Sequence, residues 1–309
     1  MKKVFDVGIV GYGPAGITAA IYAARKRLSV LLIGELPGGE ITNSGEIENW
    51  PGDRHTDGFT LADKFVNHLK DHKDVIEIVQ DKVISITKTD GEFSLAAASG
   101  KSFQAQTAIY TAGRHPRLLG VPGEAEFKNR GVSYCATCDA PLFPDKTVAV
   151  VGGGNTGAEA VIMLQKIAKR IYLLHLESAL KADPVLVDAF TGDPKVEILY
   201  NAKTTAISGE QFVNGLTYEE GQTGETKELA VDAVFVTIGA VPNTEPIKNL
   251  TALDQFGAVA ADRYGLTDVP GFFAAGDVTN IRDAQIVVAA GQGCSAALSA
   301  GDYLARRGH

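Results

Sequence analysis

The chain of 309 residues has 45% hydrophobic and 21% charged residues, the balance of a soluble globular protein with room for two domains. Its formal net charge of -8 excludes a nucleic-acid partner, because binding along a phosphate backbone requires clustered Lys and Arg. No uninterrupted apolar run reaches about 18 residues, so we predict no membrane span. Asp6, Gly8 and Gly11 interrupt any signal-peptide core, and three cysteines make no disulfide scaffold, so we expect a cytoplasmic protein.

The N-terminal segment has the element order of a dinucleotide-binding unit. We predict a buried parallel strand, a glycine-rich loop, a helix and a second buried strand at residues 4–10, 11–16, 17–26 and 29–33. The positive end of such a helix faces the phosphates of a dinucleotide.

The glycines of this loop have separate physical roles. Gly11 allows the tight turn, Gly13 lets the backbone approach a pyrophosphate and Gly16 permits close packing of the helix. Glu35 follows the second strand, where an acid could hold a ribose hydroxyl.

The next stretch contains a second glycine pair and several short elements. Gly38 and Gly39 could let the backbone pass close to a flat ring. Trp50 fits packing beside a Pro turn as well as a place beside such a ring. An amphipathic helix is predicted at 60–71. Strands are predicted at residues 76–78, 83–86, 93–95 and 108–113.

The same pattern returns later in the chain. We predict a strand, a glycine-rich loop, a helix and a strand at residues 146–151, 152–157, 158–168 and 170–175. Further strands are assigned to this second unit at residues 196–199, 204–208 and 233–238. A strand at 271–277 ends in Gly276-Asp277, and a long helix follows at 284–306.

This internal repeat predicts an α/β fold with two Rossmann-like, three-layer (ββα/βαβ) dinucleotide-binding domains, the second inserted in the first. Residues 239–243 read as the link back to the first domain. The predicted domains are residues 1–114 with 243–309, and residues 115–242.

The run Cys135-Ala136-Thr137-Cys138-Asp139 is the centre of the predicted chemistry. Two thiols at this spacing can close a small disulfide ring, in which one thiolate attacks a substrate disulfide and the other resolves the mixed disulfide. A buried pair or half of a zinc site is the alternative. Zinc needs about four ligands, and Cys294 is the only other cysteine, so we predict no metal site. We interpret Cys294 as a small buried helix residue rather than a third redox group.

The chain resembles the low-molecular-weight thioredoxin reductases, the FAD-dependent, Cys-x-x-Cys-containing members of the pyridine-nucleotide disulfide reductases. The resemblance covers essentially the whole chain. The motifs that carry it occur in the family's order: residues 11–16, Gly38-Gly39 with residues 48–52, residues 135–139, residues 152–157 and Gly276-Asp277.

The resemblance implies FAD as the cofactor, with Asp277 near the ribityl chain and phosphates. The residues that it places around FAD are Gly11, Gly13, Pro14, Ala15, Gly16, Glu35, Gly39, Glu40, Ile41, Asn49, Val83, Ala112, Gly113, Gly276, Asp277, Gln285 and Ile286. For a nicotinamide dinucleotide, the corresponding residues are Gly152, Gly154, Gly157 and Glu177.

The resemblance also assigns the catalytic roles. Cys138 is the sulfur that faces the flavin, Cys135 attacks the disulfide of the protein substrate, and Asp139 moves the proton. The family places the dithiol in the inserted domain, which rotates about links expected here at Gly113-Arg114 and Gly239-Ala240. The implied acceptor is thioredoxin or a thioredoxin-like protein, which we expect to be a separate small protein, and the implied assembly is a homodimer.

The second nucleotide unit departs from the family pattern. Members that use NADPH carry His-Arg-Arg after this strand, whereas the present chain has His175-Leu176-Glu177. A 2'-phosphate near Glu177 would meet like charge and no guanidinium fork, so we predict weak NADPH binding. Glu177 suits the 2'-hydroxyl of NADH. The family's Arg-Gln-Ala run is also altered, to Ala284-Gln285-Ile286.

NADH, NADPH, reduced ferredoxin and another, unknown donor all stay open. Ferredoxin is included because some relatives that resemble this chain have dropped nicotinamide cofactors and take electrons from reduced ferredoxin. Two other functions compete with a thioredoxin-disulfide reductase. A ferredoxin–NAD(P) reductase-like flavoprotein would lack the dithiol, and a flavin redox sensor without turnover would account for the missing arginines. The intact 135–139 run favours the reductase.

Overall fold

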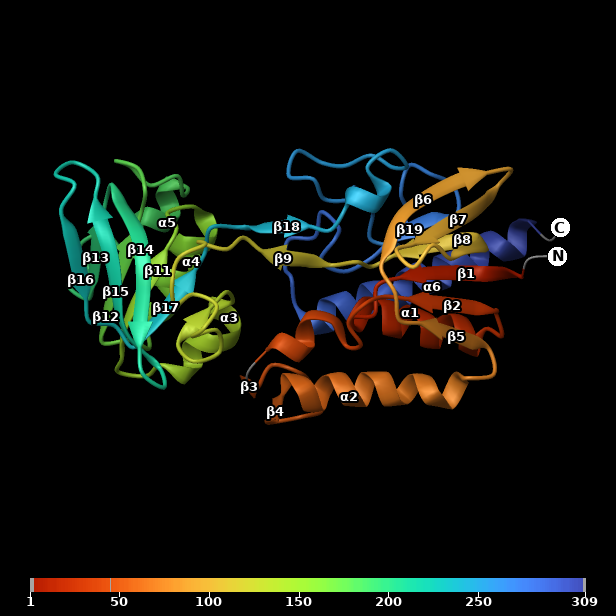
Figure 1. Ribbon diagram of the computed structural model, residues 1–309, viewed down its shortest axis with the longest axis horizontal. Helices are drawn as coiled ribbons and strands as arrows, with labels where there is room; N and C mark the ends of the chain where they lie inside the picture. Colours follow the sequence, from red (N-terminus) through yellow and green to blue (C-terminus); the bar gives the residue numbers. More distant parts are fainter. Residues whose placement is uncertain (1–2, 45, 308–309) are drawn as a thin grey trace. The chain divides into compact units, whose positions relative to one another are not determined.

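The computed structural model describes residues 3–44 and 46–307 and divides into two compact units. The discontinuous unit comprises Met1–His115 and Val241–His309, and the inserted unit comprises Pro116–Ala240. Two short paired strands, β9 (Arg114–Pro116) and β18 (Ala240–Pro242), carry the chain from one unit to the other and back (Figure 1).

The discontinuous unit is built on a mixed sheet whose β5, β2, β1, β8 and β19 run parallel. Its elements in chain order are β1 (Val4–Val10), α1 (Pro14–Arg25), β2 (Val30–Ile33), η1 (Gly39–Asn43), β3 (Glu46–Ile47), β4 (Thr56–Asp57), α2 (Gly58–Leu69), η2 (Lys70–His72), β5 (Ile76–Val79), β6 (Val83–Thr89), β7 (Glu92–Ala97), β8 (Ser102–Tyr110), η4 (Glu245–Ile247), β19 (Phe272–Ala274) and α6 (Ile286–Arg307).

Alternating side chains of this sheet enter two different cores, as the period of a strand dictates. In β2, Val30 and Leu32 pack with the small residues of α1 and α6, whereas Leu31 and Ile33 face the core that contains Phe93. Small residues let α1 and α6 approach closely, since a Cβ on Gly293 would lie 2.1 Å from the carbonyl oxygen of Ala15.

The inserted unit has three layers, with α4 on one face of a five-stranded parallel sheet and an antiparallel sheet on the other. Its elements are β10 (Val132–Ser133), α3 (Ala136–Asp139), η3 (Ala140–Leu142), β11 (Thr147–Val151), α4 (Asn155–Gln165), β12 (Arg170–Leu174), α5 (Pro184–Asp188), β13 (Val196–Leu199), β14 (Ala202–Gly209), β15 (Val213–Glu220), β16 (Thr226–Leu229) and β17 (Ala233–Val236). The predicted α/β fold class is confirmed.

The predicted starts of two helices need correction. Helix α1 begins at Pro14 rather than residue 17, because Pro is favoured in the first helical turn. Helix α4 likewise begins inside its glycine-rich loop, at Asn155. The predicted strand at residues 204–208 lies in the inserted unit as part of β14, which pairs with β15 in the antiparallel sheet, and Leu216 and Tyr218 of β15 bury their side chains against the parallel sheet.

Candidate functional site

The site residues of the discontinuous unit gather where its parallel strands end. The loop at 11–16 follows β1, residues 111–115 follow β8, and Gly276-Asp277 follows β19. Because these three strands are hydrogen-bonded in parallel register, their carboxyl ends lie at one edge of the sheet. This edge is where open α/β sheets bind ligands.

The first glycine-rich loop folds tightly around a buried threonine. Gly11 has φ +117°, and a Cβ there would lie 2.2 Å from the carbonyl oxygen of Thr111. A Cβ on Gly16 would lie 1.9 Å from the carbonyl oxygen of Gly11. The Thr111 hydroxyl donates to the carbonyl oxygen of Val10 at 2.8 Å. Only glycine therefore fits at the first and third positions of this loop.

The middle of the loop is open enough for a dinucleotide to approach. A Cβ on Gly13 would meet nothing closer than 3.8 Å, at the Cα of Gly39. Gly13 is the N-cap of α1 and provides no side-chain cap, and Pro14 takes the first helical turn with Ala15 buried behind it. The bare N-terminus and the glycine walls fit the pyrophosphate of FAD.

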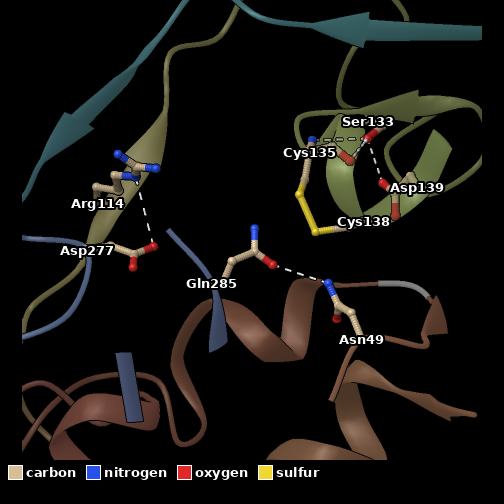
Figure 2. Close-up of a disulfide and its surroundings, with 8 residues drawn as sticks. All are labelled: Asn49, Arg114, Ser133, Cys135, Cys138, Asp139, Asp277 and Gln285. Carbon is tan, nitrogen blue, oxygen red and sulfur yellow. Dashed lines mark hydrogen bonds and ion pairs between the residues drawn. A yellow bond between two sulfur atoms is a disulfide. The ribbon is translucent and has the colours of Figure 1, made fainter. Parts of the chain in front are cut away.

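A second group of residues extends this cradle. Gly39 packs against Gly13, and a Cβ on Gly39 would lie 2.8 Å from the Cα of Gly13. The Asn49 side-chain amide donates to Oε1 of Gln285 at 3.2 Å (Figure 2). Gln285 directly precedes α6, and its carbonyl oxygen accepts the Ala289 N–H at 2.9 Å. These contacts bring residues 39–49 and the start of α6 together.

Asp277 lies half-buried behind Gly276 and pairs with Arg114, at 3.9 Å between Oδ2 and Nε (Figure 2). Burial raises the pKa of Asp277, the Arg114 guanidinium opposes that rise, and the carboxylate of Glu40 adds to it. Gly276 has φ +77°, and its N–H donates to Oε1 of Gln292 at 2.8 Å. A carboxylate in this position can accept hydrogen bonds from the hydroxyls of a sugar alcohol.

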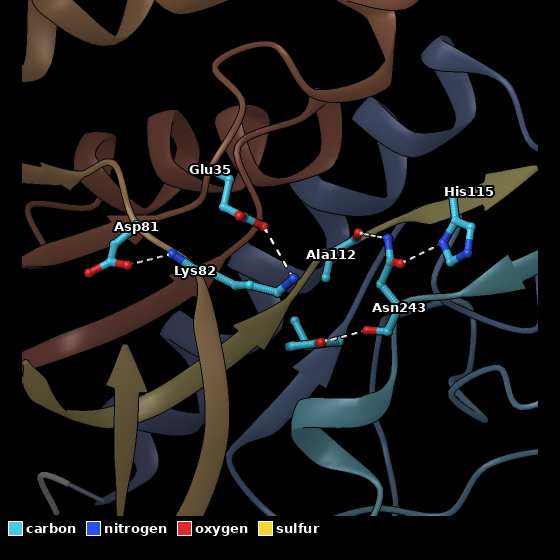
Figure 3. Close-up of polar contacts among 7 residues, drawn as sticks. Glu35, Asp81, Lys82, Ala112, His115 and Asn243 are labelled. Atoms are coloured by element: carbon cyan, nitrogen blue, oxygen red, sulfur yellow. Dashed lines mark hydrogen bonds and ion pairs between the residues drawn. The ribbon is translucent and has the colours of Figure 1, made fainter. Parts of the chain in front are cut away.

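The remaining residues that the resemblance assigns to FAD differ in exposure and in their contacts. Glu35 is exposed and lies 3.8 Å from Nζ of Lys82 (Figure 3). The carbonyl oxygens of Ala112 and Gly113 accept the side-chain and backbone N–H groups of Asn243. The three apolar members, Ile41, Val83 and Ile286, are buried or packed against buried neighbours.

Trp50 is explained by packing. Its ring lies 5.2 Å from that of Phe65, within a small cluster that contains Ile41 and Ile47.

The glycine-rich loop of the inserted unit is constructed in the same way as the first. Gly152 has φ +129°, and a Cβ there would lie 2.6 Å from the carbonyl oxygen of Thr237. A Cβ on Gly157 would lie 1.8 Å from the carbonyl oxygen of Gly152. Gly154 is the N-cap of α4 without a side-chain cap, and a Cβ there would meet nothing within 4 Å. This loop also fits a dinucleotide pyrophosphate.

Glu177 lies in the segment after β12, beyond the buried His175. Its carboxylate is exposed and forms an ion pair of 2.5 Å with Lys181, which lowers the pKa of Glu177. The N–H groups of Lys181 and Ala182 donate to the carbonyl oxygen of Gly153, at 2.8 and 3.1 Å. The acid expected to meet the ribose is therefore held on a segment that is bonded to the glycine-rich loop.

The two cysteines of the central run form a disulfide, with 5.3 Å between the Cα atoms of Cys135 and Cys138. They follow β10, which is parallel to β17, so the disulfide is at the same edge of the sheet as the second glycine-rich loop. Cys135 is half-buried and the Cys138 residue is exposed. A disulfide of this accessibility can exchange with a second thiol pair.

Ser133 connects the acid of this run to the disulfide. Its hydroxyl donates to Oδ2 of Asp139 at 2.5 Å and accepts the Cys135 N–H at 3.1 Å (Figure 2). Burial raises the pKa of Asp139, and the Ser133 hydrogen bond opposes this. A carboxyl group with a raised pKa, next to two sulfurs, is suited to giving a proton to a departing thiolate.

Ser133, Thr111 and Thr237 also shape these sites and were not predicted from the sequence. A signal for the threonines was present, since Thr111-Ala112-Gly113 and Thr237-Ile238-Gly239 each follow a buried strand with the same Thr-x-Gly order. Nothing comparable pointed to Ser133, because its hydrogen bonds depend on the turn into α3.

Two negative findings apply to residues 3–44 and 46–307 alone. No cluster of three or more His, Cys, Asp or Glu side chains there is arranged to hold a metal ion. None of the helices in those ranges has the length and apolar character that crossing a membrane requires.

Comparison with known proteins agrees with this geometry. The family model described as "Pyridine nucleotide-disulphide oxidoreductase" matches residues 5–293. Among solved structures, a thioredoxin reductase from Streptococcus pyogenes MGAS5005 superposes with a TM-score of 0.93 at 35% identity, covering 99% of this chain and 100% of that one.

Curated relatives carry different names. The chain is 43% identical over 306 residues to "NADH dehydrogenase" of Bacillus subtilis (strain 168). It is 41% identical over 305 residues to a protein of Staphylococcus aureus (strain Mu50 / ATCC 700699) that is named as a subunit of alkyl hydroperoxide reductase. Each alignment covers 99% of this chain but 60% of the relative, so the chain spans a little over half the length of the curated relatives that it matches.

Proposed function

The chain belongs to the pyridine nucleotide-disulphide oxidoreductase family, and from this we propose that it is an FAD-dependent disulfide reductase that uses NADH. The proposed acceptor is the disulfide of thioredoxin or a thioredoxin-like protein. The observation that carries the proposal is the Cys135–Cys138 disulfide, with the Asp139 carboxyl beside it, in a unit that has its own nucleotide-type loop.

FAD, when bound, accepts electrons as a hydride and passes them on to a disulfide. The residues that would hold it are the loop at 11–16 with its N–H groups and its open Gly13, the Gly39 turn, and the carboxylates of Asp277 and Glu35. The second loop, at 152–157, would hold the phosphates of NADH, and Glu177 would accept the hydrogen bonds of its ribose.

The reduced dithiol would act by two successive exchanges. The Cys135 thiolate attacks one sulfur of the partner disulfide, which forms a mixed disulfide and releases the other partner sulfur as a thiolate. The Cys138 thiolate then attacks the Cys135 sulfur, which restores the Cys135–Cys138 disulfide and releases the second partner sulfur. Two electrons reach the partner, and the protons for its thiols come from Asp139 and from solvent.

The preference for NADH is supported by charge. A 2'-phosphate at the end of β12 would lie near the ionised Glu177, whose pKa is lowered by Lys181. A phosphate beside an ionised carboxylate is repelled by its like charge, whereas a ribose hydroxyl can donate a hydrogen bond to the carboxylate. The name of the Bacillus subtilis relative, NADH dehydrogenase, points the same way.

Anaerobic mixing tests the donor directly. The purified protein, loaded with FAD, is mixed with NADH, NADPH or reduced ferredoxin, and the bleaching of the flavin absorbance is followed. We expect rapid bleaching by micromolar NADH. The NADPH concentration that gives the same bleaching rate should be at least about tenfold higher. Rapid bleaching by micromolar NADPH, or by ferredoxin alone, would contradict the proposed donor.

The acceptor is tested separately with oxidised thioredoxin and an excess of NADH. We expect two thioredoxin thiols to appear for each NADH that is oxidised. Flavin bleaching without the appearance of thiols would leave the donor proposal standing and refute thioredoxin as the acceptor.

A further inference from the structure

Arg114 is a charged residue of the linker strand whose role the function above does not use. It follows Gly113, which has φ +66°, and begins β9. Its side chain is one-third exposed, as is that of Asp277, with which it pairs at 3.9 Å between Nε and Oδ2. A residue of the linker is therefore in contact with the expected flavin site.

Asn243 forms a clamp around the linker root, residues 112–115, to which Arg114 belongs. Figure 3 shows the bonds of Asn243 to Ala112 and His115. The Asn243 side-chain amide donates to the carbonyl oxygen of Ala112 at 2.8 Å, and the Asn243 backbone N–H donates to that of Gly113 at 3.0 Å. On the other side of Arg114, Nδ1 of His115 lies 2.9 Å from Oδ1 of Asn243. Asn243 thus holds the chain both before and after Arg114.

The clamp is itself anchored in the core. The hydroxyl of Tyr110, a fully buried residue at the end of β8, donates to the carbonyl oxygen of Asn243 at 2.6 Å. The linker root is therefore attached to the sheet whose carboxyl edge holds the flavin residues, and Arg114 has a defined direction toward Asp277.

The charges around Asp277 explain why a cation is useful there. Burial raises the pKa of Asp277, the Glu40 carboxylate adds to that rise, and Arg114 opposes it. FAD would bring the negative charges of its pyrophosphate to the same edge of the sheet. Without a compensating cation, phosphates and carboxylates of like charge would repel one another.

We propose that Arg114 is a flavin-binding residue supplied by the linker strand, which pairs with Asp277 and offsets the repulsion between this carboxylate and the FAD phosphates. Coupling free energies are reciprocal. If Arg114 in this position strengthens FAD binding, bound FAD stabilises Arg114 in this position by the same amount. Flavin occupancy thereby stabilises the root of the linker. This proposal depends on FAD binding alone and is independent of the proposed donor and acceptor.

Flavin affinity provides the test, measured by titrating apoprotein with FAD and following the quenching of flavin fluorescence. We expect Arg114→Gln to raise the Kd for FAD roughly tenfold, because a charge-assisted contact that is part-exposed is lost. Arg114→Lys should retain most of the affinity. Arg263→Gln removes an equal charge from an exposed position of the same unit and should change the Kd less than about twofold.

A double variant decides whether Arg114 acts through Asp277. In the Asp277→Asn background, Arg114→Gln should have a much smaller effect on the Kd than in the wild type. An unchanged Kd for Arg114→Gln alone, or an equal fold-change in both backgrounds, would overturn the proposal. Circular dichroism of each apoprotein confirms that a changed Kd does not come from unfolding.

Hydrogen exchange tests the coupling to the linker. The Asn243 backbone N–H, which is bonded to the carbonyl oxygen of Gly113, should exchange more slowly when FAD is bound to the wild type. Saturating FAD should protect it less in Arg114→Gln. Equal protection in the two proteins would contradict a role of Arg114 in holding the linker root.

Discussion

The two glycine-rich loops of this chain are constructed alike but lie in different surroundings. In each loop, a first glycine with positive φ packs against the carbonyl oxygen of a buried threonine, and a last glycine packs against the first. In both, the threonine hydroxyl donates to a carbonyl oxygen at the end of the strand that precedes the glycine-rich loop. The distance is 2.8 Å from Thr111 to Val10 and 3.0 Å from Thr237 to Val151. The shared part accounts for a dinucleotide cradle but not for the choice of dinucleotide.

The differences lie around the loops. The first is packed by Gly39 and, through Ala15, by α6, whereas the second is bonded to the segment that carries Lys181 and Ala182. The inserted unit also places a disulfide at the edge of the sheet where its loop lies. The same cradle can therefore support flavin binding in one unit and sulfur chemistry in the other, because different residues come after the neighbouring strands.

The largest expected effect comes from removing the sulfur chemistry, which the first unit lacks. Cys135→Ser should lower thioredoxin reduction by at least about a thousandfold, because the attacking thiolate is lost, while NADH still bleaches the flavin. The readout is thiol release measured beside flavin absorbance. Cys294→Ser, on α6, is the matched control and should retain turnover; retained turnover in Cys135→Ser would refute the assigned nucleophile.

Replacing the acid beside the disulfide should have the next largest effect. Asp139→Asn cannot give up a proton, so turnover with thioredoxin should fall by about a hundredfold. Ser133→Ala, which removes the hydrogen bond but leaves the acid, should cost much less. Equal losses in the two variants, measured as kcat at saturating NADH, would show that Asp139 has only a structural role.

The ligands of the two glycine-rich loops can be told apart by adding one methyl group to the open glycine of each loop. Gly13→Ala and Gly154→Ala meet no atom closer than 3.8 Å in the protein, so both should fold normally. We expect Gly13→Ala to weaken FAD binding and Gly154→Ala to raise the KM for NADH, each by about tenfold, since the methyl group occupies the approach of the phosphates. The reverse pattern would exchange the roles of the two units.

Glu35 and Glu177 follow the second strands of the two units, and replacing them should have smaller and more specific effects on ligand binding. Glu177→Arg should improve the use of NADPH relative to NADH by about tenfold or more, because a guanidinium replaces a like charge beside the 2'-phosphate. Glu35→Gln should leave this ratio unchanged and weaken only FAD binding. A ratio that shifts with Glu35→Gln but not with Glu177→Arg would contradict the assignment.

The smallest expected effect is on stability. Because burial raises the pKa of Asp139, the native state keeps a proton that the unfolded chain has released between the ordinary carboxyl pKa and the raised one. The free energy of unfolding of the wild type should therefore fall, relative to Asp139→Asn, as pH rises through that window. Urea unfolding from about pH 4 to 7 measures the difference, and a difference that rises with pH would contradict the sign.

Much of the fold was predictable because its signals are local. Buried apolar strands, each followed by a glycine-rich loop, indicated both units, and the Thr-x-Gly repeats were also visible in the sequence. The antiparallel strands β15 and β16 were missed, since Gly215 and a run of acidic residues weaken their apolar alternation. Their pairing with β14 depends on contacts that local pattern does not record.

The site was less predictable than the fold. The residue types for FAD and disulfide chemistry could be named from motifs, but their partners come from segments far apart in the chain. The pairing of Arg114 with Asp277 and the clamp around Asn243 each join the two halves of the discontinuous unit. The Ser133 hydrogen bond to Asp139 depends likewise on the turn after β10.

The central claim is that one chain passes electrons from NADH through FAD to the Cys135–Cys138 disulfide. An anaerobic titration with NADH, followed by flavin absorbance and by thiol counting, measures this capacity. FAD and the disulfide are each two-electron acceptors, so wild type should take up about two NADH per chain and Cys135→Ser about one. Uptake of a single NADH by both proteins, with no thiols formed in the wild type, would contradict the account.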